Sequence, residues 1–480
     1  MNHLRHLAPS RSATLAILLG ALALGGCASF SMDGGRASVA DVVRERIGKD
    51  ARPILNDTDA NAVRDRVAEL LRQPLTADDA VQVALLANRG LQATYGELGI
   101  AEADLAQAGR FQNPGFNFRR TRQGDDILIE RTFTVSLIQA LTRPLAVRIE
   151  RGRFEAVKLA VADAVLRVAA DTRRAYYEAV AAEQSVAYAK QVNTAADAGA
   201  DLARRMRAAG NWSTLEQARE EAFYADSVAG VARAAKAAVR TRERLTRLMG
   251  LYGEATQFTL PDRLPELPAT PLEVRDAETY ALENRLDIQA GKLSTESLAV
   301  SLGLSKATRF INVLDLSYDN NSATGQPRER GYEIRVEIPI FDWGTARVAK
   351  AEAIYMQAIN RFAEIAVNAR SEVRQSYLAY RTDYDLARHY RDVVVPLRKR
   401  ISDQNQLRYN GMLISVFELL ADAREQVKSI NATIEALRDF WIAETDLSAA
   451  LGGSLPDATN ANNSNSAMTP TPLHAPNQGP

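Results

Sequence analysis

The chain has 480 residues, of which 46% are hydrophobic, 25% are charged and 6% are aromatic. Basic and acidic residues are balanced at 59 each, so the sequence lacks the cationic excess that is typical of nucleic-acid-binding proteins. Scarce aromatic residues, together with abundant Ala, Arg and Glu, favour long helices over an all-β fold.

The first segment has the pattern of a targeting signal. Arg5 and Arg11 precede a short apolar run over residues 14–24, and such a run is too short to cross a bilayer as a helix. Its end, LALGGC, resembles the lipobox of bacterial lipoproteins. This resemblance implies that residues 1–26 are a signal peptide, that Cys27 is lipidated and becomes the mature N-terminus, and that Ala28 after it favours the outer membrane.

An alternative is an ordinary secretory peptide with an incidental cysteine. Because Cys27 is the only cysteine in the chain, no intrachain disulfide can form. We expect residues 27–74 to be an N-terminal anchor segment. At the other end, residues 454–480 are polar and rich in Pro and Asn, which predicts a disordered tail.

The rest of the chain is an internal duplication. LTADDAVQVALLANRGLQA at residues 75–93 is similar to LEVRDAETYALENRLDIQA at residues 272–290. A second pair, RRMRAAGNWS and NQLRYNGMLIS, aligns Gly210 with Gly411. We therefore predict repeat 1 at residues 75–252, a Pro-rich linker at residues 253–271, and repeat 2 at residues 272–453.

Each repeat predicts the same elements in the same order. A helix capped by Thr76 extends to about residue 108 in repeat 1, and two short alternating segments follow it. A long helix then covers residues 143–209 or 345–409 and ends at a turn, where glycine is expected to take a positive φ. A returning helix ends near residue 250 or 452. Pro396 predicts a kink in the second long helix rather than a break.

The stretch GYEIRVEIPIFDWG, residues 331–344, predicts a strand with alternate apolar residues from Tyr332 to Ile340. A helix of some 65 residues would be about 100 Å long and needs an antiparallel partner helix. Outside the signal segment no apolar run approaches the roughly 18 residues of a membrane-spanning helix, so only strands could cross a membrane. Four strands cannot close a barrel, but three chains with four strands each would supply twelve. The alternative is a small sheet on a soluble helical domain, with its apolar face turned inward.

Four segments carry a resemblance to the outer-membrane efflux proteins, the TolC-like family: LTADDAVQVALLANRGLQA, AEADLAQAGRFQNPGFNF, VEIPIFDWGTARVAKAEA and LRYNGMLISVFELLADAREQ. The resemblance implies a mainly α fold with a small β part, in which a homotrimer forms a twelve-stranded transmembrane barrel and a helical periplasmic tunnel. Pro339 and Gly344 would mark the bend from strand to helix. The helical tips would meet a periplasmic adaptor and an inner-membrane pump.

Two groups of candidate site residues follow from this resemblance. Acidic residues six and nine positions after the second-repeat glycine form the constriction in the family, but here Phe417 and Leu420 occupy those positions. Either the acidic ring has moved to Glu418 and Asp422, or Phe417 forms an apolar plug, or the two carboxylates are simply solvated. Candidates for adaptor docking are Gly210, Asn211, Trp212, Asn410, Gly411 and Met412, although Trp212 and Phe417 could equally pack between helices.

Motifs for catalysis or metal binding do not stand out. After the signal segment only His389 and His474 remain as histidines, and HExxH, GxSxG and phosphate-loop patterns are missing from the sequence. We therefore predict no enzyme activity, no bound metal, and no cofactor besides the lipid on Cys27.

The leading hypothesis is a lipid-anchored outer-membrane duct of a tripartite efflux system that carries small molecules or metal ions. One alternative makes it the outer-membrane duct of a type I protein secretion system. Another, of a different class, is a lipid-anchored periplasmic coiled-coil scaffold without a pore. The sequence specifies neither the cargo, nor the adaptor and pump, nor the trigger that opens the gate.

Overall fold

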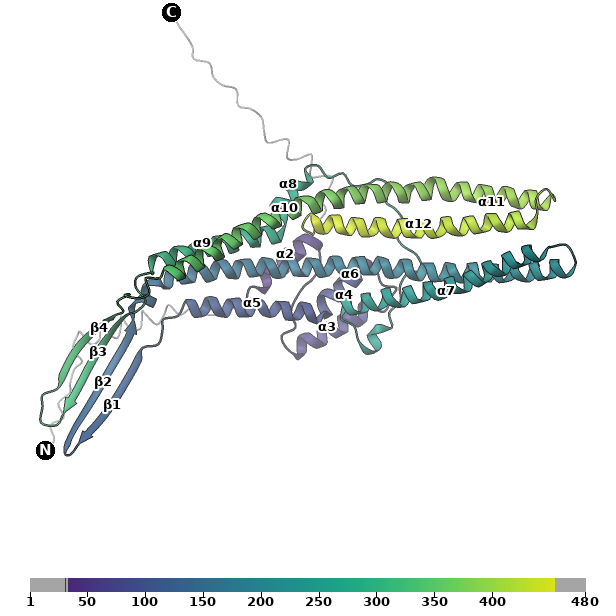
Figure 1. Ribbon diagram of the computed structural model, residues 1–480. Coiled ribbons are helices and arrows are strands. Elements are labelled where there is room, and N and C mark those ends of the chain that lie inside the picture. The colour runs from purple at the N-terminus through teal and green to yellow at the C-terminus, as the bar shows by residue number, and fades with distance from the viewer. Residues whose placement is uncertain (1–30, 32, 454–480) are drawn as a thin grey trace, which may run out of the picture. The chain divides into compact units, whose positions relative to one another are not determined.

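The computed structural model describes residue 31 and residues 33–453, which form long helices and one small sheet (Figure 1). The predicted signal peptide, Cys27 and the predicted tail at 454–480 lie outside the described residues. The described chain divides into two compact units. Of the described residues, the strand unit comprises 31, 33–39, Thr94–Val161 and Asp287–Ile365, and the core unit comprises Ala40–Ala93, Ala162–Leu286 and 366–453.

The segment that was predicted only as an anchor contains two helices, α2 (Arg36–Ile47) and α3 (Asp57–Leu70). The Asn56 side chain caps α3, because its Oδ1 accepts a hydrogen bond of 2.8 Å from the Asp59 N–H. Val67 of α3 is buried in the core of repeat 1. This segment therefore packs onto the repeat rather than acting only as a tether.

The single helix predicted from residue 76 to about residue 108 is wrong, because the structure has two helices, α4 (Ala77–Ala87) and α5 (Arg89–Ala108). Thr76 caps α4 as expected, since its Oγ1 accepts from the Asp79 N–H. Asn88 interrupts the helix with a ψ of 116°. Its Nδ2 donates to the Leu248 carbonyl and its Oδ1 accepts from the Leu91 N–H, so the side chain replaces lost helical hydrogen bonds.

Repeat 2 has the same break. Here α8 (Ala277–Asn284) and α9 (Leu286–Ala307) are separated by Arg285, whose ψ is 129°. Asn88 and Arg285 occupy equivalent positions in the two copies, although their side chains differ. The break therefore belongs to the repeat and not to one side chain.

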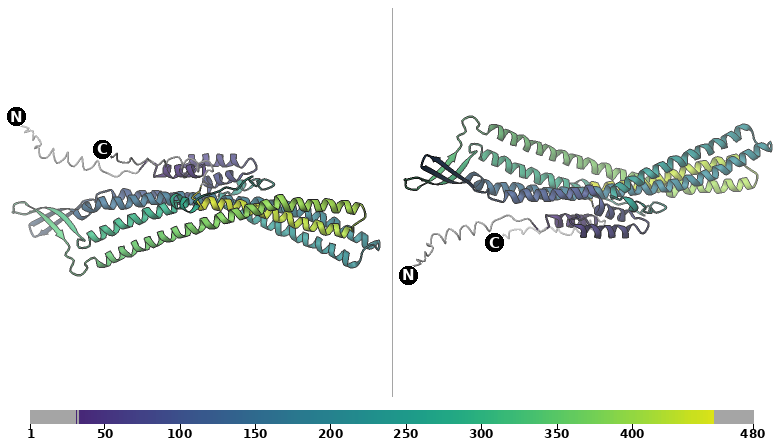
Figure 2. Two further views of the ribbon diagram at one scale, coloured as in Figure 1. Left: turned by 90° about the horizontal axis from the view of Figure 1, so that it is seen from above. Right: turned by 90° about the horizontal axis from the view of Figure 1, so that it is seen from below.

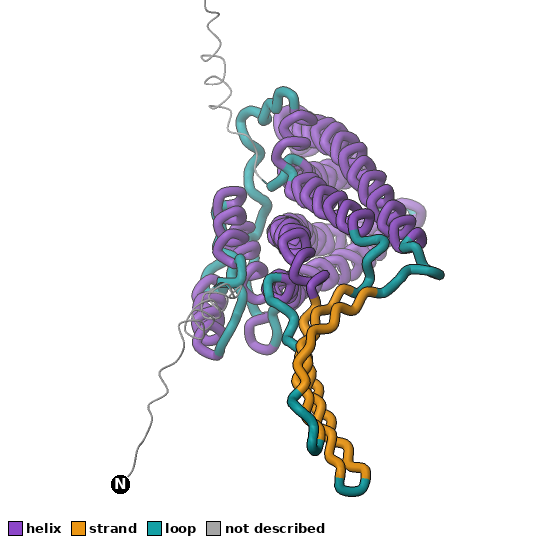
Figure 3. Tube along the Cα trace, turned by 90° about the vertical axis from the view of Figure 1, so that its left-hand side faces the viewer, coloured by secondary structure: helices purple, strands orange, loops and turns teal. Residues whose placement is uncertain are grey.

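The four strands are β1 (Gly115–Gln123), β2 (Asp126–Ser136), β3 (Leu314–Ala323) and β4 (Glu329–Val336). They form one antiparallel sheet in the order β1-β2-β3-β4, which Figure 3 shows as two neighbouring hairpins. The pairing of β2 with β3, in which Phe133 lies opposite Tyr318, joins the two repeats. This sheet confirms the predicted strands and the small β part of the fold.

The predicted extent of the last strand needs correction, since β4 ends at Val336 and not at Ile340. The Glu337 N–H still donates to the Val313 carbonyl at 3.3 Å. Pro339 has no N–H to offer to a neighbouring strand, and the Ile340 N–H turns back to the Ile338 carbonyl at 2.9 Å. The alternating pattern thus continues in sequence beyond the point where pairing stops.

The first long helix, α6 (Leu137–Ala208), has 72 residues, and α7 (Thr214–Met249) returns beside it. In repeat 2 the long helix consists of α10 (Thr345–His389), the five-residue π-helical turn η2 (Tyr390–Val394) and α11 (Val395–Asn410), after which α12 (Val416–Ala450) returns. Figure 2 shows α11 and α12, coloured green to yellow, side by side.

The chain stays helical through Pro396, so the proline does not break the helix. A proline cannot donate the usual hydrogen bond to the carbonyl four residues earlier, and the preceding π turn absorbs that loss. None of the described helices carries an apolar stretch of membrane-spanning length.

Each repeat has its own hydrophobic core in the core unit. The core of repeat 1 gathers residues of α4, α6 and α7, and the core of repeat 2 gathers residues of α8, α10 and α12. The Tyr176 hydroxyl donates to the Leu75 carbonyl at 2.9 Å in repeat 1, and the Leu272 N–H donates to the Tyr380 hydroxyl at 2.8 Å in repeat 2. A buried tyrosine thus positions the residue just before the first helix of each copy.

The predicted linker at residues 253–271 contains a 3-10 turn, η1 (Gly253–Thr256), followed by an extended segment. Phe258 and Leu264 of this segment are buried in the core of repeat 1, whereas Leu267 is buried in the core of repeat 2. The linker therefore contributes apolar side chains to both cores in turn.

Candidate functional site

The apolar face of the sheet carries large side chains that remain exposed. Its central row crosses all four strands, because the register places Phe116 opposite Phe133, Phe133 opposite Tyr318, and Tyr318 opposite Tyr332. The ring centroids of Phe116 and Phe133 are 4.7 Å apart, and those of Tyr318 and Tyr332 are 6.2 Å apart. Phe116 is 57% exposed and Tyr332 is 84% exposed.

Further apolar residues extend this face toward the helical end of the sheet. Val135 lies opposite Leu316, which lies opposite Ile334, and Leu314 lies opposite Val336. Ile334 is 67% exposed. A contiguous exposed apolar surface of this kind marks a site that contacts lipid or another protein.

The opposite, polar face of the sheet consists mainly of side chains that favour water. The Thr132 hydroxyl donates to Asp319 Oδ1 at 2.5 Å, and the hydroxyl groups of Thr134 and Ser317 lie 2.9 Å apart. One face is therefore mainly apolar, and the other is suited to water.

The sheet is open in the described chain. The two outer strands, β1 and β4, pair on one side only. An unpaired strand edge presents backbone N–H and C=O groups that can pair with another strand. These two edges flank an exposed apolar face, so the single chain offers two edges with which further strands can pair.

The predicted bend residues Pro339 and Gly344 lie in the segment between the end of β4 and the start of α10. Gly344 is buried with a φ of 70°, and a Cβ atom there would lie 2.5 Å from the Arg309 carbonyl oxygen. This position therefore requires glycine both for its backbone conformation and for the close approach of the Arg309 backbone.

The turn between α6 and α7 has the expected glycine geometry. Gly210 has a φ of 79°, its N–H donates to the Arg207 carbonyl, and the Asn211 N–H donates to the Met206 carbonyl at 2.9 Å. Ser213 then caps α7 in a complete capping box with Glu216. Hydrogen bonds from the Ser213 backbone and side chain hold the pKa of the Glu216 carboxyl below its usual value.

The turn between α11 and α12 corrects the prediction for repeat 2. Gly411 has a φ of −80°, and the left-handed residue is Met412, with a φ of 58°. The Met412 N–H donates to the Tyr409 carbonyl at 2.9 Å, and the Leu413 N–H donates to the Arg408 carbonyl at 2.8 Å. These bonds are those of the first turn, so Met412 is the structural equivalent of Gly210.

The predicted alignment of Gly210 with Gly411 is thus one residue out of register. The helix caps agree with the corrected register, because Ser415 caps α12 as Ser213 caps α7. Both Ser415 and Met412 follow their counterparts by 202 positions. Sequence similarity favoured the glycine pair, whereas the hydrogen bonds of the turn decide the true correspondence.

The docking candidates divide by exposure. Gly210, Asn211, Asn410 and Gly411 are exposed. Met412 is 93% exposed, but Trp212 is only 8% exposed. The Trp212 side chain is therefore largely buried within the described chain and does not present itself to a partner.

The constriction candidates lie at the start of α12. Glu418 is exposed, and its N–H donates to the Ser415 side chain. Asp422 is half-buried and forms no ion pair among the described residues. Phe417 is half-buried, and its ring centroid lies 5.5 Å from the Arg219 guanidinium and 6.0 Å from the Arg424 guanidinium. The contact with Arg219 ties Phe417 to the neighbouring helix α7, whereas Arg424 lies on α12 itself.

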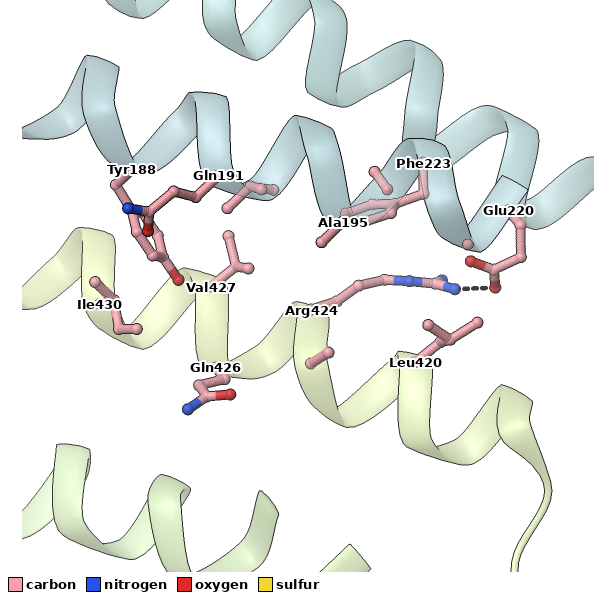
Figure 4. Close-up of a pocket in the computed structure, with 14 residues that line it drawn as sticks. Tyr188, Gln191, Ala195, Glu220, Phe223, Leu420, Arg424, Gln426, Val427 and Ile430 are labelled. Atoms are coloured by element: carbon pink, nitrogen blue, oxygen red, sulfur yellow. Dashed lines mark hydrogen bonds and ion pairs between the residues drawn. The ribbon is translucent and has the colours of Figure 1, made fainter. Parts of the chain in front are cut away.

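An inter-repeat ion pair that the sequence did not reveal lies beside these residues. Glu220 of α7 is 2% exposed and pairs with Arg424 of α12. The pair borders a pocket of about 320 Å³ between α6, α7 and α12, and the same guanidinium lies 5.0 Å from the Phe223 ring centroid (Figure 4). Most of the pocket lining is apolar, including Ala195, Leu420 and Val427.

This ion pair had no sequence signal, because Glu220 lies in an ordinary run of charged helical residues.

Within the part of the chain that the structure describes, no group of three or more His, Cys, Asp or Glu residues could hold a metal ion.

Residues 279–453 match the family model described as outer membrane efflux protein. The match covers repeat 2 from within α8 to the end of the described chain, and it includes β3, β4 and the α11–α12 tip. The chain carries an outer membrane efflux protein domain. No protein with a curated description matches the chain.

Solved structures share the fold of this chain over most of its length. The CmeC outer membrane channel of Campylobacter jejuni is 16% identical, with a TM-score of 0.67, and the match covers 87% of this chain and 92% of that one. The open state of the MtrE outer membrane channel of Neisseria gonorrhoeae is 18% identical, with a TM-score of 0.65 and coverages of 78% and 88%.

A membrane protein from Pseudomonas aeruginosa is 20% identical, with a TM-score of 0.68 and coverages of 79% and 90%. These three likenesses establish a shared fold, including the part of the chain outside the efflux-protein match. They confirm the predicted architecture of long helices with a few strands per chain.

Proposed function

We propose that this chain is the channel subunit of an outer-membrane efflux system, a passive duct through which small molecules or metal ions leave the cell. The observation that carries the proposal is the open four-stranded sheet, which has an exposed apolar face, a polar face and two unpaired edges. The efflux-protein match over residues 279–453 supports the same function.

Three copies of the chain would complete the duct. Pairing of β1 in one copy with β4 in the next would remove both open edges and yield a twelve-stranded barrel. The apolar face would contact lipid, and the polar face would line the lumen. Symmetry would then repeat each lumen-facing side chain three times around the axis.

The remaining assignments are also proposals. The exposed tip residues Asn211 and Met412 would contact a periplasmic adaptor that links the duct to an inner-membrane pump. A lipid on Cys27 would add a second anchor in the outer membrane. Glu418 and Asp422 remain the candidates for a charged constriction, because a ring of three carboxylates would favour cations.

The decisive experiment is reconstitution of the purified, membrane-extracted protein into planar bilayers. We expect a trimer by mass and discrete conductance steps of uniform size. Replacing Tyr332 with Asp on the apolar face should prevent insertion, whereas replacing Thr132 with Asp on the polar face should leave it intact. A monomeric helical rod that never conducts ions would support a coiled-coil scaffold and overturn the proposal.

A further inference from the structure

Beyond the apolar rows, the same face of the sheet carries a group of arginines near the hairpin turns. The register places Phe118 opposite Arg131 and Asn320 opposite Arg330 in one cross-strand row, and Arg120 opposite Ile129 in the next. Arg122, opposite Ile127, ends this series. We name these four residues the arginine row: Arg120, Arg122, Arg131 and Arg330.

The charges of the two faces of the sheet differ in sign. Over β1 to β4, the face with the arginine row carries no carboxylate. The polar face carries two arginines and six carboxylates, namely Arg119, Arg335, Asp126, Glu130, Asp315, Asp319, Glu329 and Glu333. On that face Arg119 lies 3.4 Å from Glu130, and Arg335 lies 3.8 Å from Glu333.

The guanidinium groups of the arginine row use only part of their capacity for hydrogen bonds and ion pairs within the chain. Arg122 donates to the Gly124 carbonyl at 2.9 Å and lies 3.8 Å from Asp125, and Arg131 lies 6.0 Å from the Phe118 ring centroid. Arg120 and Arg330 are exposed and form no ion pair among the described residues. These two guanidinium groups are therefore available to an anion from outside the chain.

The position of the row limits what that anion can be. If the apolar face contacts lipid, an arginine near the middle of the bilayer would be strongly destabilising, and this cost falls toward zero at the interface. The row lies between the apolar rows and the hairpin turns, so it falls at headgroup level. A ligand there must place its apolar chains along Tyr332 and Ile334 and its anionic groups beside Arg330.

We propose that the arginine row binds the phosphate groups of an anionic membrane lipid in the leaflet that surrounds the hairpin turns. Guanidinium groups are permanently charged and bind phosphate with two parallel hydrogen bonds, which suits them to this role. The proposal rests on the proposed function, because it requires the sheet to lie in a membrane. It adds that the sheet binds anionic lipid selectively, besides presenting an apolar surface to the membrane.

The test uses the full-length trimer in phosphatidylcholine vesicles that contain a small fraction of diphosphorylated lipid A. After extraction in mild detergent, the lipid A retained per trimer is counted by native mass spectrometry. The double variant Arg120→Gln and Arg330→Gln removes the two unpaired cations. The matched control, Arg119→Gln with Arg335→Gln, removes the same charge from the same two strands but on the polar face.

We expect the control to retain as much lipid A as the unmodified protein. One cation near an anionic lipid surface favours binding by about fivefold. The Arg120/Arg330 variant should therefore retain at least about fivefold less lipid A per trimer than the unmodified protein. Dephosphorylated lipid A lacks the phosphate groups, so the unmodified protein should retain it as weakly as the variant retains lipid A. Equal retention by the variant and the unmodified protein overturns the proposal, as does complete displacement of lipid A by inorganic phosphate.

Conductance of the same vesicles separates this proposal from the proposed function. If the channels conduct and retention does not depend on Arg120 and Arg330, only the lipid site is wrong. If the unmodified protein neither inserts nor conducts, the proposed function fails and the lipid site fails with it.

Discussion

The helical hairpins of the two repeats follow one backbone plan but differ at equivalent positions. The first long helix, α6, is continuous over 72 residues, whereas its counterpart contains the π turn η2 before Pro396. Gly210 forms the first tip turn, and Met412 forms the second at a strained φ. Glu220 is buried in an ion pair, whereas Asp422, 202 residues later, is half-buried and unpaired among the described residues.

The difference shows what duplication preserves. Caps, breaks and tyrosine contacts recur because each copy must satisfy its own backbone. The side chains at the tips diverge where the two hairpins pack on each other. Glu220 from repeat 1 pairs with Arg424 from repeat 2, whereas the equivalent positions hold Asp422 and Ala222, so the reciprocal ion pair cannot form.

The largest effect on stability is expected from substitutions at two equivalent glycines, which follow the returning helices α7 and α12. A Cβ at Gly250 would lie 2.5 Å from the Ala87 carbonyl oxygen, whereas one at Gly452 would lie 3.3 Å from the Asn284 carbonyl oxygen. Both have a positive φ. We expect Gly250→Ala to lower the free energy of unfolding by about 4 kcal/mol and Gly452→Ala by about 2 kcal/mol. Urea unfolding followed by circular dichroism measures both, and equal losses would contradict the comparison.

A slightly smaller effect concerns the ion pair. Glu220→Ala leaves the Arg424 guanidinium without its carboxylate in a largely apolar pocket, so we expect a loss of about 3 kcal/mol in the free energy of unfolding. Asp422→Ala should change it by less than about 0.5 kcal/mol. Glu220→Gln is the control, since it keeps an acceptor and the side-chain volume and should lose less than Glu220→Ala. A similar loss for Asp422→Ala would show that the two equivalent positions contribute equally to stability.

Proline at the position of Pro396 should not be tolerated in α6, although that helix contains Pro144 near its start. Thr194 of α6 is the equivalent of Pro396, and no π turn precedes it. Thr194→Pro should cost about 3 kcal/mol in the free energy of unfolding, because the ring removes one helical hydrogen bond and clashes with the Lys190 carbonyl.

The reverse change, Pro396→Ala, should alter the free energy of unfolding by less than about 1 kcal/mol. It should slow amide hydrogen exchange at residues 390–396 as the π turn becomes regular helix. Unchanged exchange there would show that the π turn has a cause other than the proline.

The smallest effect concerns the tip turns. Met412→Gly should raise the free energy of unfolding by about 0.5–1 kcal/mol, because glycine accepts a positive φ without strain. Gly210→Ala should lower it by about 1 kcal/mol for the same reason. Gly411→Ala serves as the matched control and should be nearly neutral, since its φ is −80°. A loss at Gly411 as large as that at Gly210 would restore the original alignment of the two turns.

Local patterns predicted the elements of this chain well. The duplication, the cap at Thr76, the hairpin strands and the continuation of the helix through Pro396 each depend on residues close in sequence, and the structure contains all four. The break at Asn88 was missed because the carbonyl that accepts the Asn88 side-chain hydrogen bond belongs to Leu248, far along the chain. The true end of β4 was missed because alternation continues past Pro339, where strand pairing stops.

The sequence alone determined the order of the elements, the two faces of each strand and the need for a partner, because period and capping are properties of neighbouring residues. Only the tertiary structure decided that Met412 and not Gly411 turns the second tip, that Trp212 is buried, and that Glu220 meets Arg424. Each of these depends on which backbone or side chain approaches from a distant segment. Periodicity carries no information about such an approach.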